Sequence, residues 1–148
     1  MNTAEFRWPI RVYYEDTDAG GIVFYANYLK FFERARTEWL RAAGVGQQLL
    51  ASETGCMFVV KNASIDYHAP ALLDDRLEIS VQIQKLGRAS VLFTQEAWRL
   101  NDHGTLRLCT GNIRVGCVDI NSLRPAEIPA AVFKKISIAE ASAFNAGI

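Results

Sequence analysis

The feature that most constrains this chain is one segment of helical periodicity, residues 27–43, in a sequence whose other apolar runs have the period of a β-strand. Apolar residues recur in this segment at steps of three and four, the spacing of one helical face. Further apolar residues widen that face, so we expect one long helix that is buried over more than half of its circumference. The face consists of Tyr28, Phe32, Ala35, Trp39 and Ala42, widened by Leu29, Phe31 and Leu40.

Residues typical of helix ends flank this segment. Asn27 is a candidate N-cap, because its side-chain oxygen can accept a hydrogen bond from an unpaired amide of the first turn. Gly44 follows the last periodic residue, at the position where a left-handed conformation commonly ends a helix.

The rest of the chain has the patterns of strands. In "RLEISVQIQK", residues 76–85, every second residue is Leu, Ile or Val and the others are polar or charged, which indicates a half-buried strand. Pro9 places the first strand at a sheet edge, or lies near that strand's start. The predicted strands span residues 6–14, 56–67, 76–85, 89–100 and 105–118.

Two further signals concern the C-terminal half. The apolar phase of the last strand switches across Gly111, which suggests a β-bulge at that glycine. Pro129 is expected to open a short helix, "PAAVFKKI". The Ala-rich tail, residues 138–148, is expected to fray.

The order of elements is therefore a strand, one long helix and four more strands. One antiparallel sheet that covers one helix is an α+β arrangement, and 148 residues favour a single domain over residues 1–148. Such a sheet leaves edges open, and pairing with a second copy would cover them.

Composition excludes several functions. Lys and Arg together equal Asp and Glu at 16 each, which argues against a nucleic-acid partner. No apolar run approaches the roughly 18 residues of a transmembrane segment, and the N-terminus lacks a secretory signal. The three cysteines, an odd number without metal-type spacing, are expected to be core or strand residues in a reducing cytoplasm. No cluster of metal ligands is evident.

The chemistry is expected in "DTDAGGIVFYANY", where an acidic turn enters the helix. A helix start has unpaired amides that can stabilise an oxyanion, and Gly20 and Gly21 let a ligand approach the backbone. The carboxylate of Asp18 can attack a carbonyl or activate a water. The alternative is that Asp18 only satisfies turn amides while the two glycines make the bend.

The stretches "YYEDTDAGGIVFYANYLKFFERARTEWL", residues 13–40, and "NASIDYHAPALLDDRLEI", residues 62–79, carry a resemblance to a known family. They resemble the hotdog-fold acyl-CoA thioesterases of the 4-hydroxybenzoyl-CoA thioesterase family, especially its Tol-Pal-associated bacterial branch. The resemblance implies a long helix wrapped by an antiparallel sheet and an active site at a dimer interface. It also implies hydrolysis of an acyl-CoA to a carboxylate and free CoA, with no cofactor besides the CoA of the substrate.

The resemblance also assigns roles to residues. Asp18 matches the catalytic aspartate, as nucleophile or general base, and the Tyr25 backbone amide matches the oxyanion donor. Many members of the Tol-Pal-associated branch have histidine at position 25, so tyrosine here leaves the acyl preference open. Gly20, Gly21 and Asn27 are expected to line the substrate site.

Weaker candidates lie elsewhere. Arg88 and Lys85 flank a turn where the family binds the CoA nucleotide. Arg88 is the stronger candidate for this contact, because the arginine side chain is suited to binding phosphate. Ser64, with Asn62, is expected to face a partner's substrate. Structural or surface roles are expected for Glu33, His68 and His103.

Three functions remain open. The first is an acyl-CoA thioesterase, acting as a homodimer or homotetramer, with CoA or acyl-carrier protein as the acyl carrier. The second is a non-catalytic hotdog module that binds acyl thioesters or a protein partner. The third, a hotdog dehydratase, is disfavoured because it would need a histidine where Tyr25 stands.

Overall fold

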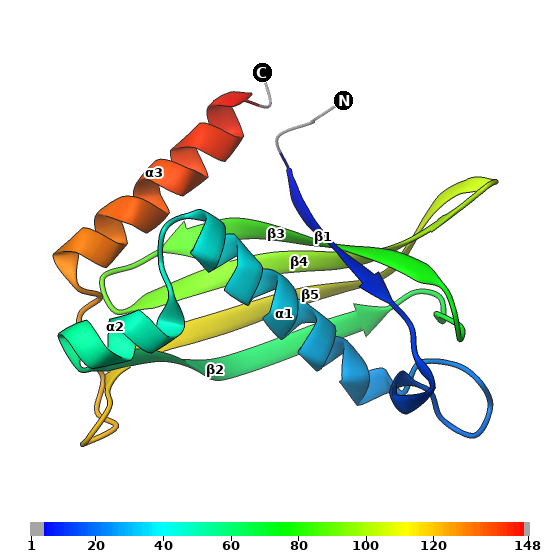
Figure 1. The fold of residues 1–148 in the computed structure, drawn as a ribbon, viewed down its shortest axis with the longest axis horizontal. Coiled ribbons are helices and arrows are strands. Elements are labelled where there is room, and N and C mark those ends of the chain that lie inside the picture. The colour runs from blue at the N-terminus through cyan, green and yellow to red at the C-terminus, as the bar shows by residue number, and fades with distance from the viewer. Residues whose placement is uncertain (1–4, 147–148) are drawn as a thin grey trace.

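The computed structural model describes residues 5–146, and its main feature is one five-stranded antiparallel sheet (Figure 1). The strand order is β1-β3-β4-β5-β2, so β1 and β2 are the edge strands. Pro9 lies in β1, which confirms its expected place at an edge. The strands are β1 (Phe6–Arg11), β2 (Cys56–Tyr67), β3 (Arg76–Leu86), β4 (Ser90–Asn101) and β5 (Gly104–Asp119).

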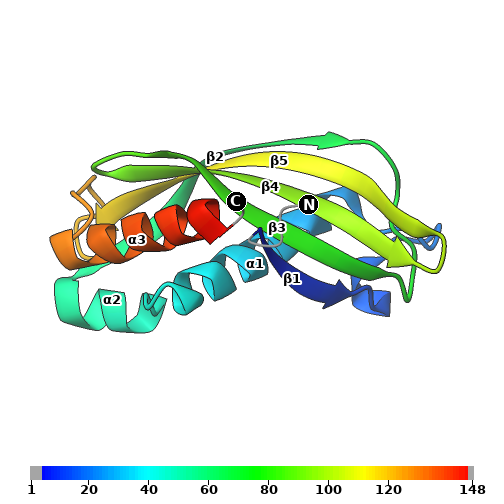
Figure 2. The same cartoon turned by 90° about the horizontal axis from the view of Figure 1, so that it is seen from above.

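The long helix α1 (Tyr28–Ala42) packs across one face of this sheet. Its predicted apolar face is buried: Phe31, Phe32 and Ala35 have no exposed surface. They pack against inward residues of the sheet such as Ile79 and Phe93. All helices lie on this side of the sheet (Figure 2). The expected α+β class, with one buried helix against one antiparallel sheet, is confirmed.

The ends of α1 lie where the sequence predicted them, but Asn27 makes a different hydrogen bond from the one expected. Asn27 occupies the N-cap position, but its side chain makes no capping hydrogen bond, so the predicted cap is wrong. Instead its side-chain amide donates to the carboxylate of Asp16. Gly44, just past the helix, has a φ of +92°, which only glycine adopts readily.

Two helices were missed or misjudged in the sequence. A short helix, α2 (Gln47–Thr54), lies between α1 and β2 and was not predicted. The helix expected after Pro129 is long, not short: α3 runs over Ala130–Ala146. Residues 138–146 of the tail belong to this helix, and residues 147–148 lie outside the described part of the chain.

The predicted bulge at Gly111 is wrong. The register of β5 against β4 shifts at Leu108, so that Leu108 and Cys109 are both buried. Gly111 has another role, because a Cβ at this position would lie 2.5 Å from Cε2 of Phe32. The glycine therefore lets α1 pack directly on the sheet.

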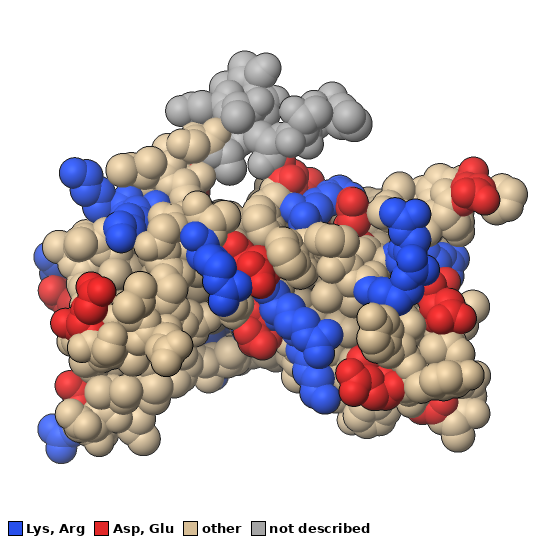
Figure 3. All heavy atoms as spheres, viewed as in Figure 1, with Lys and Arg blue, Asp and Glu red and all other residues tan. Residues whose placement is uncertain are grey.

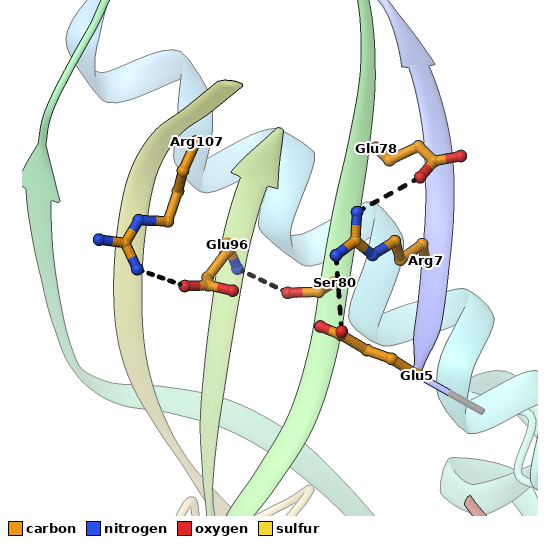
Figure 4. Close-up of polar contacts among 6 residues, drawn as sticks. All are labelled: Glu5, Arg7, Glu78, Ser80, Glu96 and Arg107. Atoms are coloured by element: carbon orange, nitrogen blue, oxygen red, sulfur yellow. Dashed lines mark hydrogen bonds and ion pairs between the residues drawn. The ribbon is translucent and has the colours of Figure 1, made fainter. Parts of the chain in front are cut away.

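The face of the sheet away from α1 is polar. Arg7 forms ion pairs with Glu5 and Glu78, and Arg107 forms one with Glu96 (Figure 4). The Ser80 hydroxyl accepts the backbone amide of Glu96 at 2.9 Å. These contacts cross four strands and place charged side chains along the outer face.

The molecule as a whole has no dominant charge. Acidic and basic side chains are interspersed on the face that carries α1 (Figure 3), in keeping with the equal counts of 16. Cys109 and Cys117 are buried and Cys56 is half-buried, and all three are free thiols. Among the described residues, no helix has the length and apolarity needed to cross a membrane.

Candidate functional site

The acidic turn before α1 is a tight, well-bonded loop. The Gly21 amide donates to the Asp18 carbonyl at 3.0 Å, and the Asp18 amide donates to the Ile22 carbonyl at 2.9 Å. Gly21 has a φ of +79°, a conformation that side chains rarely adopt. The glycine is thus required by the turn itself.

The carboxylate of Asp18 is exposed and held at one oxygen. Its Oδ1 accepts the Gly20 amide at 2.8 Å, and a Cβ on Gly20 would lie 3.3 Å from that oxygen. Within residues 5–146, Oδ2 accepts no hydrogen bond. The turn therefore fixes the carboxylate through one oxygen and presents the other to solvent, where a substrate can reach it.

A buried acid that the sequence analysis overlooked, Asp16, ties the loop to the helix. Its side chain accepts the Tyr13 amide and the Asn27 side-chain amide, each at 2.8 Å. Its backbone carbonyl accepts the Phe24 amide at 3.0 Å. Asp16 is only 4% exposed, so both ends of the loop that carries Asp18 are anchored in the interior. Its burial could not be distinguished from that of the neighbouring acids by pattern alone.

Tyr25 begins a 3₁₀ turn, Tyr25–Asn27, that leads directly into α1. Among the described residues its backbone N–H donates to no carbonyl or side chain. Its carbonyl accepts the Tyr67 hydroxyl at 2.6 Å. Burial, with smaller effects from Cys109 and Tyr25, raises the pKa of Tyr67, so this hydroxyl remains a donor at neutral pH. The Tyr25 amide is therefore unpaired at a helix start, and the Tyr67 hydroxyl of β2 restrains the backbone of this residue through its carbonyl.

Three exposed aromatic residues cluster at this helix start. The ring of Tyr25 lies 4.9 Å from that of Phe24 and 6.4 Å from that of Tyr67. Tyr25, Phe24 and Tyr67 are 65%, 48% and 47% exposed, and Leu72, which pairs with Ile22 of the loop, is 45% exposed. Apolar groups left open around a polar centre are typical of a surface that a ligand or partner covers.

The other predicted site residues are placed less centrally. The Gly20 amide is engaged by Asp18, and the Asn27 side chain is buried against Asp16, so both position the loop. Ser64 pairs with Asn112 in the register of β2 and β5, next to the inward pair of Ala63 and Ile113, and therefore lies on the face away from α1.

Arg88 follows β3, whose end lies at the far end of the sheet from the loop before α1 (Figure 1). The acidic loop follows Arg11, which pairs with Arg76 at the start of β3, whereas Arg88 follows the end of β3. That strand spans roughly 33 Å at 3.3 Å per residue. Arg88 is exposed and lies 3.9 Å from Glu127. Its expected CoA contact stays a prediction that requires a second protomer.

The remaining candidates have surface positions. His68 is exposed and its Nε2 lies 3.3 Å from the Thr110 hydroxyl, while His103 lies in the turn between β4 and β5. Lys85 and Glu33 are exposed on β3 and α1. Among the described residues, no three His, Cys, Asp or Glu side chains are grouped as metal ligands would be.

Comparison with known proteins places this geometry in a family. Residues 20–105 match the Thioesterase superfamily. The chain is 47% identical over 132 residues to the acyl-CoA thioester hydrolase YbgC of Escherichia coli O6:H1, covering 89% of this chain and 96% of that protein. It is 46% identical to the acyl-CoA thioesterase YbgC of Haemophilus influenzae, covering 84% and 88%.

Solved structures agree on the fold. A probable thioesterase from Bartonella henselae is 34% identical, with a TM-score of 0.73, covering 84% of this chain and 99% of that chain. A mutant 4-hydroxybenzoyl-CoA thioesterase complexed with 4-hydroxybenzoyl-CoA superposes with a TM-score of 0.82 at 20% identity, covering 90% and 99%. The expected hotdog fold and the resemblance to this family are confirmed.

Proposed function

Because the chain belongs to the Thioesterase superfamily, we propose that it hydrolyses an acyl-CoA thioester to a carboxylate and free CoA. The observation that carries this proposal is that one loop presents both a fixed, exposed Asp18 carboxylate and, at the helix start that follows, the unpaired amide of Tyr25. The YbgC relatives, whose names state this activity, support it.

The mechanism uses only groups of this chain and water. The thioester carbonyl oxygen accepts a hydrogen bond from the Tyr25 amide, where the partial positive charge of the helix start favours a developing oxyanion. In one route Asp18 bonds to the carbonyl carbon, the CoA thiolate leaves and is protonated, and water hydrolyses the resulting anhydride. In the other, Asp18 takes a proton from a water as that water attacks the same carbon, and the C–S bond then breaks so that the CoA thiolate leaves and is protonated. No step in either route requires a cofactor.

The oxyanion donor and the general base each contribute a substantial part of a catalytic rate enhancement. Loss of one oxyanion donor typically costs about 2.7–4 kcal/mol, and a positioned general base contributes roughly 10²–10⁴ in rate. The donor at position 25 is a backbone amide, which every residue but proline provides. The Tyr25 side chain, on a residue that is 65% exposed, then contributes to the preference for one acyl group over another.

A second copy of the chain is part of the proposal. The edge strand β2 has exposed residues along Val60–Ser64 and a free edge, which a second β2 can pair with. A homodimer, or a homotetramer built from it, would bring Arg88 or Ser64 of one protomer towards the loop of another. Light scattering that gives the mass of a monomer at assay concentration would contradict this arrangement. The free thiols suit the proposed cytoplasmic location.

One observation favours a second candidate, a non-hydrolytic module that binds acyl thioesters. Oδ1 of Asp18 is already engaged by the Gly20 amide, as it would be in a purely structural turn. In that case the helix start would bind the thioester carbonyl without attack. Wild-type protein that binds acyl-CoA and releases no thiol would establish this alternative.

The deciding experiment is Asp18→Asn, assayed on a panel of acyl-CoAs by free-thiol detection. The asparagine oxygen can still accept the Gly20 amide, so the turn is kept while the nucleophile or base is removed. We expect kcat to fall at least about 10²-fold. Glu15→Gln is the matched control, since Glu15 is an exposed acid of the same loop. This variant should keep the kcat of the wild type. Undiminished turnover by Asp18→Asn would refute the catalytic role.

A further inference from the structure

The loop that carries Asp18 is a small β-hairpin. Thr17 and Val23 face each other in an antiparallel bridge, and the Asp18 amide donates to the Ile22 carbonyl at 2.9 Å. The Asp18 carboxylate therefore lies at the turn of this hairpin, between its two strands. A two-stranded hairpin alone is marginally stable at best, so the position of this carboxylate depends on what the hairpin pairs with and packs against.

A third extended segment, residues 71–73, pairs with the hairpin, and we call it the backing segment. It belongs to the connection between β2 and β3. Its Leu72 forms an antiparallel bridge with Ile22, and its Ala71 carbonyl accepts the Val23 amide at 2.9 Å. The hairpin is therefore the outer part of a three-stranded unit, and any movement of the backing segment moves the hairpin with it.

One buried hydroxyl, that of Tyr28, joins the backing segment to α1. It accepts the Ala71 amide at 3.2 Å across 43 positions of the sequence, and the two residues are 2% and 0% exposed. The Tyr28 ring lies edge-on to the rings of Phe31 and Tyr67 at 5.8 and 5.7 Å, which fixes the direction of the hydroxyl. Burial raises the pKa of Tyr28 to about 12, with the Ala71 hydrogen bond opposing that shift, so the hydroxyl stays protonated at neutral pH.

We infer that Tyr28 is a positioning residue that sets the distance between the Asp18 carboxylate and the Tyr25 amide. Tyr28 is the first residue of α1 and directly follows the 3₁₀ turn that Tyr25 begins, so its backbone belongs to the element that presents the amide. Its hydroxyl holds the backing segment, which in turn holds the hairpin that presents the carboxylate. The role of Tyr28 rests on the proposed function, in which both groups act on one carbonyl.

Loss of the Tyr28 hydroxyl should tilt the hairpin without unfolding it. In Tyr28→Phe the Ala71 amide stays buried and has lost its acceptor, which costs more than the net value of the bond, so the backing segment is expected to shift. The other strand of the hairpin keeps its own tie to the helix start, because the Asn27 side-chain amide still donates to Asp16 at 2.8 Å. With one tie of two removed, the carboxylate moves relative to the Tyr25 amide.

The test compares Tyr28→Phe with the wild type by amide hydrogen exchange of the unliganded protein and by steady-state kinetics. The Val23 amide, whose own acceptor is unchanged, should exchange at least about tenfold faster, while amides in the centre of β4 keep their rates. We expect kcat to fall at least about fivefold, because small misplacements of reacting groups are costly. KM should stay within about twofold, since a side chain this buried does not contact substrate.

Ile79→Val is the control for a general loss of stability. It removes one methyl group from a fully buried residue of β3, which lowers the free energy of unfolding without touching the hairpin or the backing segment. Its Val23 exchange rate and its kcat should match those of the wild type. An unchanged Val23 exchange rate in Tyr28→Phe, or a loss of kcat that Ile79→Val reproduces, would overturn the inference.

A double variant shows whether Tyr28 acts through the carboxylate. In an Asp18→Asn background, Tyr28→Phe should lower the residual kcat by less than about twofold, because no carboxylate is left to position. A further loss as large as the loss in the wild-type background would contradict the positioning role.

The wild-type protein decides the matter if Tyr28→Phe fails to fold. Its Ala71 and Val23 amides should open together, with the same response to denaturant, as members of one unit. An Ala71 amide that exchanges as fast as in a free chain, or that opens independently of Val23, would overturn the inference. Failure of the proposed function would appear separately, as wild-type protein that releases no thiol from acyl-CoA whatever its exchange rates.

Discussion

Tyr67→Phe isolates a single hydrogen bond in the proposed oxyanion site. The Tyr67 hydroxyl donates to the Tyr25 carbonyl at 2.6 Å, and the two residues are 42 positions apart in the sequence. The substitution removes one oxygen and leaves the ring, which packs edge-on against the rings of Tyr25 and Tyr28 at 6.4 and 5.7 Å. Only the restraint on the peptide chain at Tyr25 is lost.

The expected effect follows from the net value of one hydrogen bond, about 0.5–1.5 kcal/mol. If the whole of it acts on the orientation of the oxyanion donor, kcat falls by roughly two- to tenfold, since about 1.36 kcal/mol corresponds to a factor of ten. KM should change little, because the ring surface around the mouth of the site is kept. Steady-state kinetics with an acyl-CoA that the wild type hydrolyses well would measure both constants.

Tyr25→Phe is the matched control for this prediction. It removes the hydroxyl of a neighbouring exposed tyrosine but keeps the backbone amide and the carbonyl that Tyr67 bonds. Its kcat should stay within about twofold of the wild type. A Tyr67→Phe enzyme with unchanged kcat, or a Tyr25→Phe enzyme with an equal loss, would refute the reasoning.

Two further predictions concern stability. Gly111→Ala places a Cβ 2.5 Å from Cε2 of Phe32 and should lower the free energy of unfolding by about 1–3 kcal/mol. In Gly116→Ala the new Cβ meets the flexible Lys61 side chain, so the free energy of unfolding should fall by less. Urea titrations that reverse this order would contradict the packing argument. Burial raises the pKa of Cys109 and of Tyr28 to about 12, above the values of about 8.5 and 10 for an unfolded chain. Folded molecules therefore hold these protons more tightly, and the free energy of unfolding should fall as the pH rises from about 9 towards 12. In Cys109→Ala this free energy should fall less steeply with pH. An unchanged slope in that variant would contradict the role assigned to Cys109.

The sequence alone determined the elements that have strong local signals. The period of residues 27–43 predicted the buried helix α1 to within one residue at each end. Alternation in residues 76–85, and strand-type composition elsewhere, placed four strands almost to their observed bounds. These patterns are legible because an element that is buried on one face must repeat its apolar residues with its own period. The short helix α2 has no such stripe, so periodicity could not detect it.

Features that depend on contacts between distant residues were decided only by the tertiary structure. Gly111 was predicted to form a bulge because the apolar phase switches across it, but its need for space comes from Phe32, a residue of another element. Asn27 was predicted to cap the helix from its residue type, but its side chain bonds to Asp16, whose burial is not visible in the sequence.

The candidate site divides in the same way. The local motif predicted Asp18 and Gly21 as site residues and the family resemblance added the Tyr25 amide, because a turn and a helix start are made by neighbours in the chain. The role of Tyr67 could not be predicted from the sequence, since its hydrogen bond to the Tyr25 carbonyl joins residues 42 positions apart. One short segment of the sequence thus predicted which groups stand at the start of α1. Only the tertiary structure shows that a distant tyrosine holds them there, because a contact across the fold leaves no local pattern.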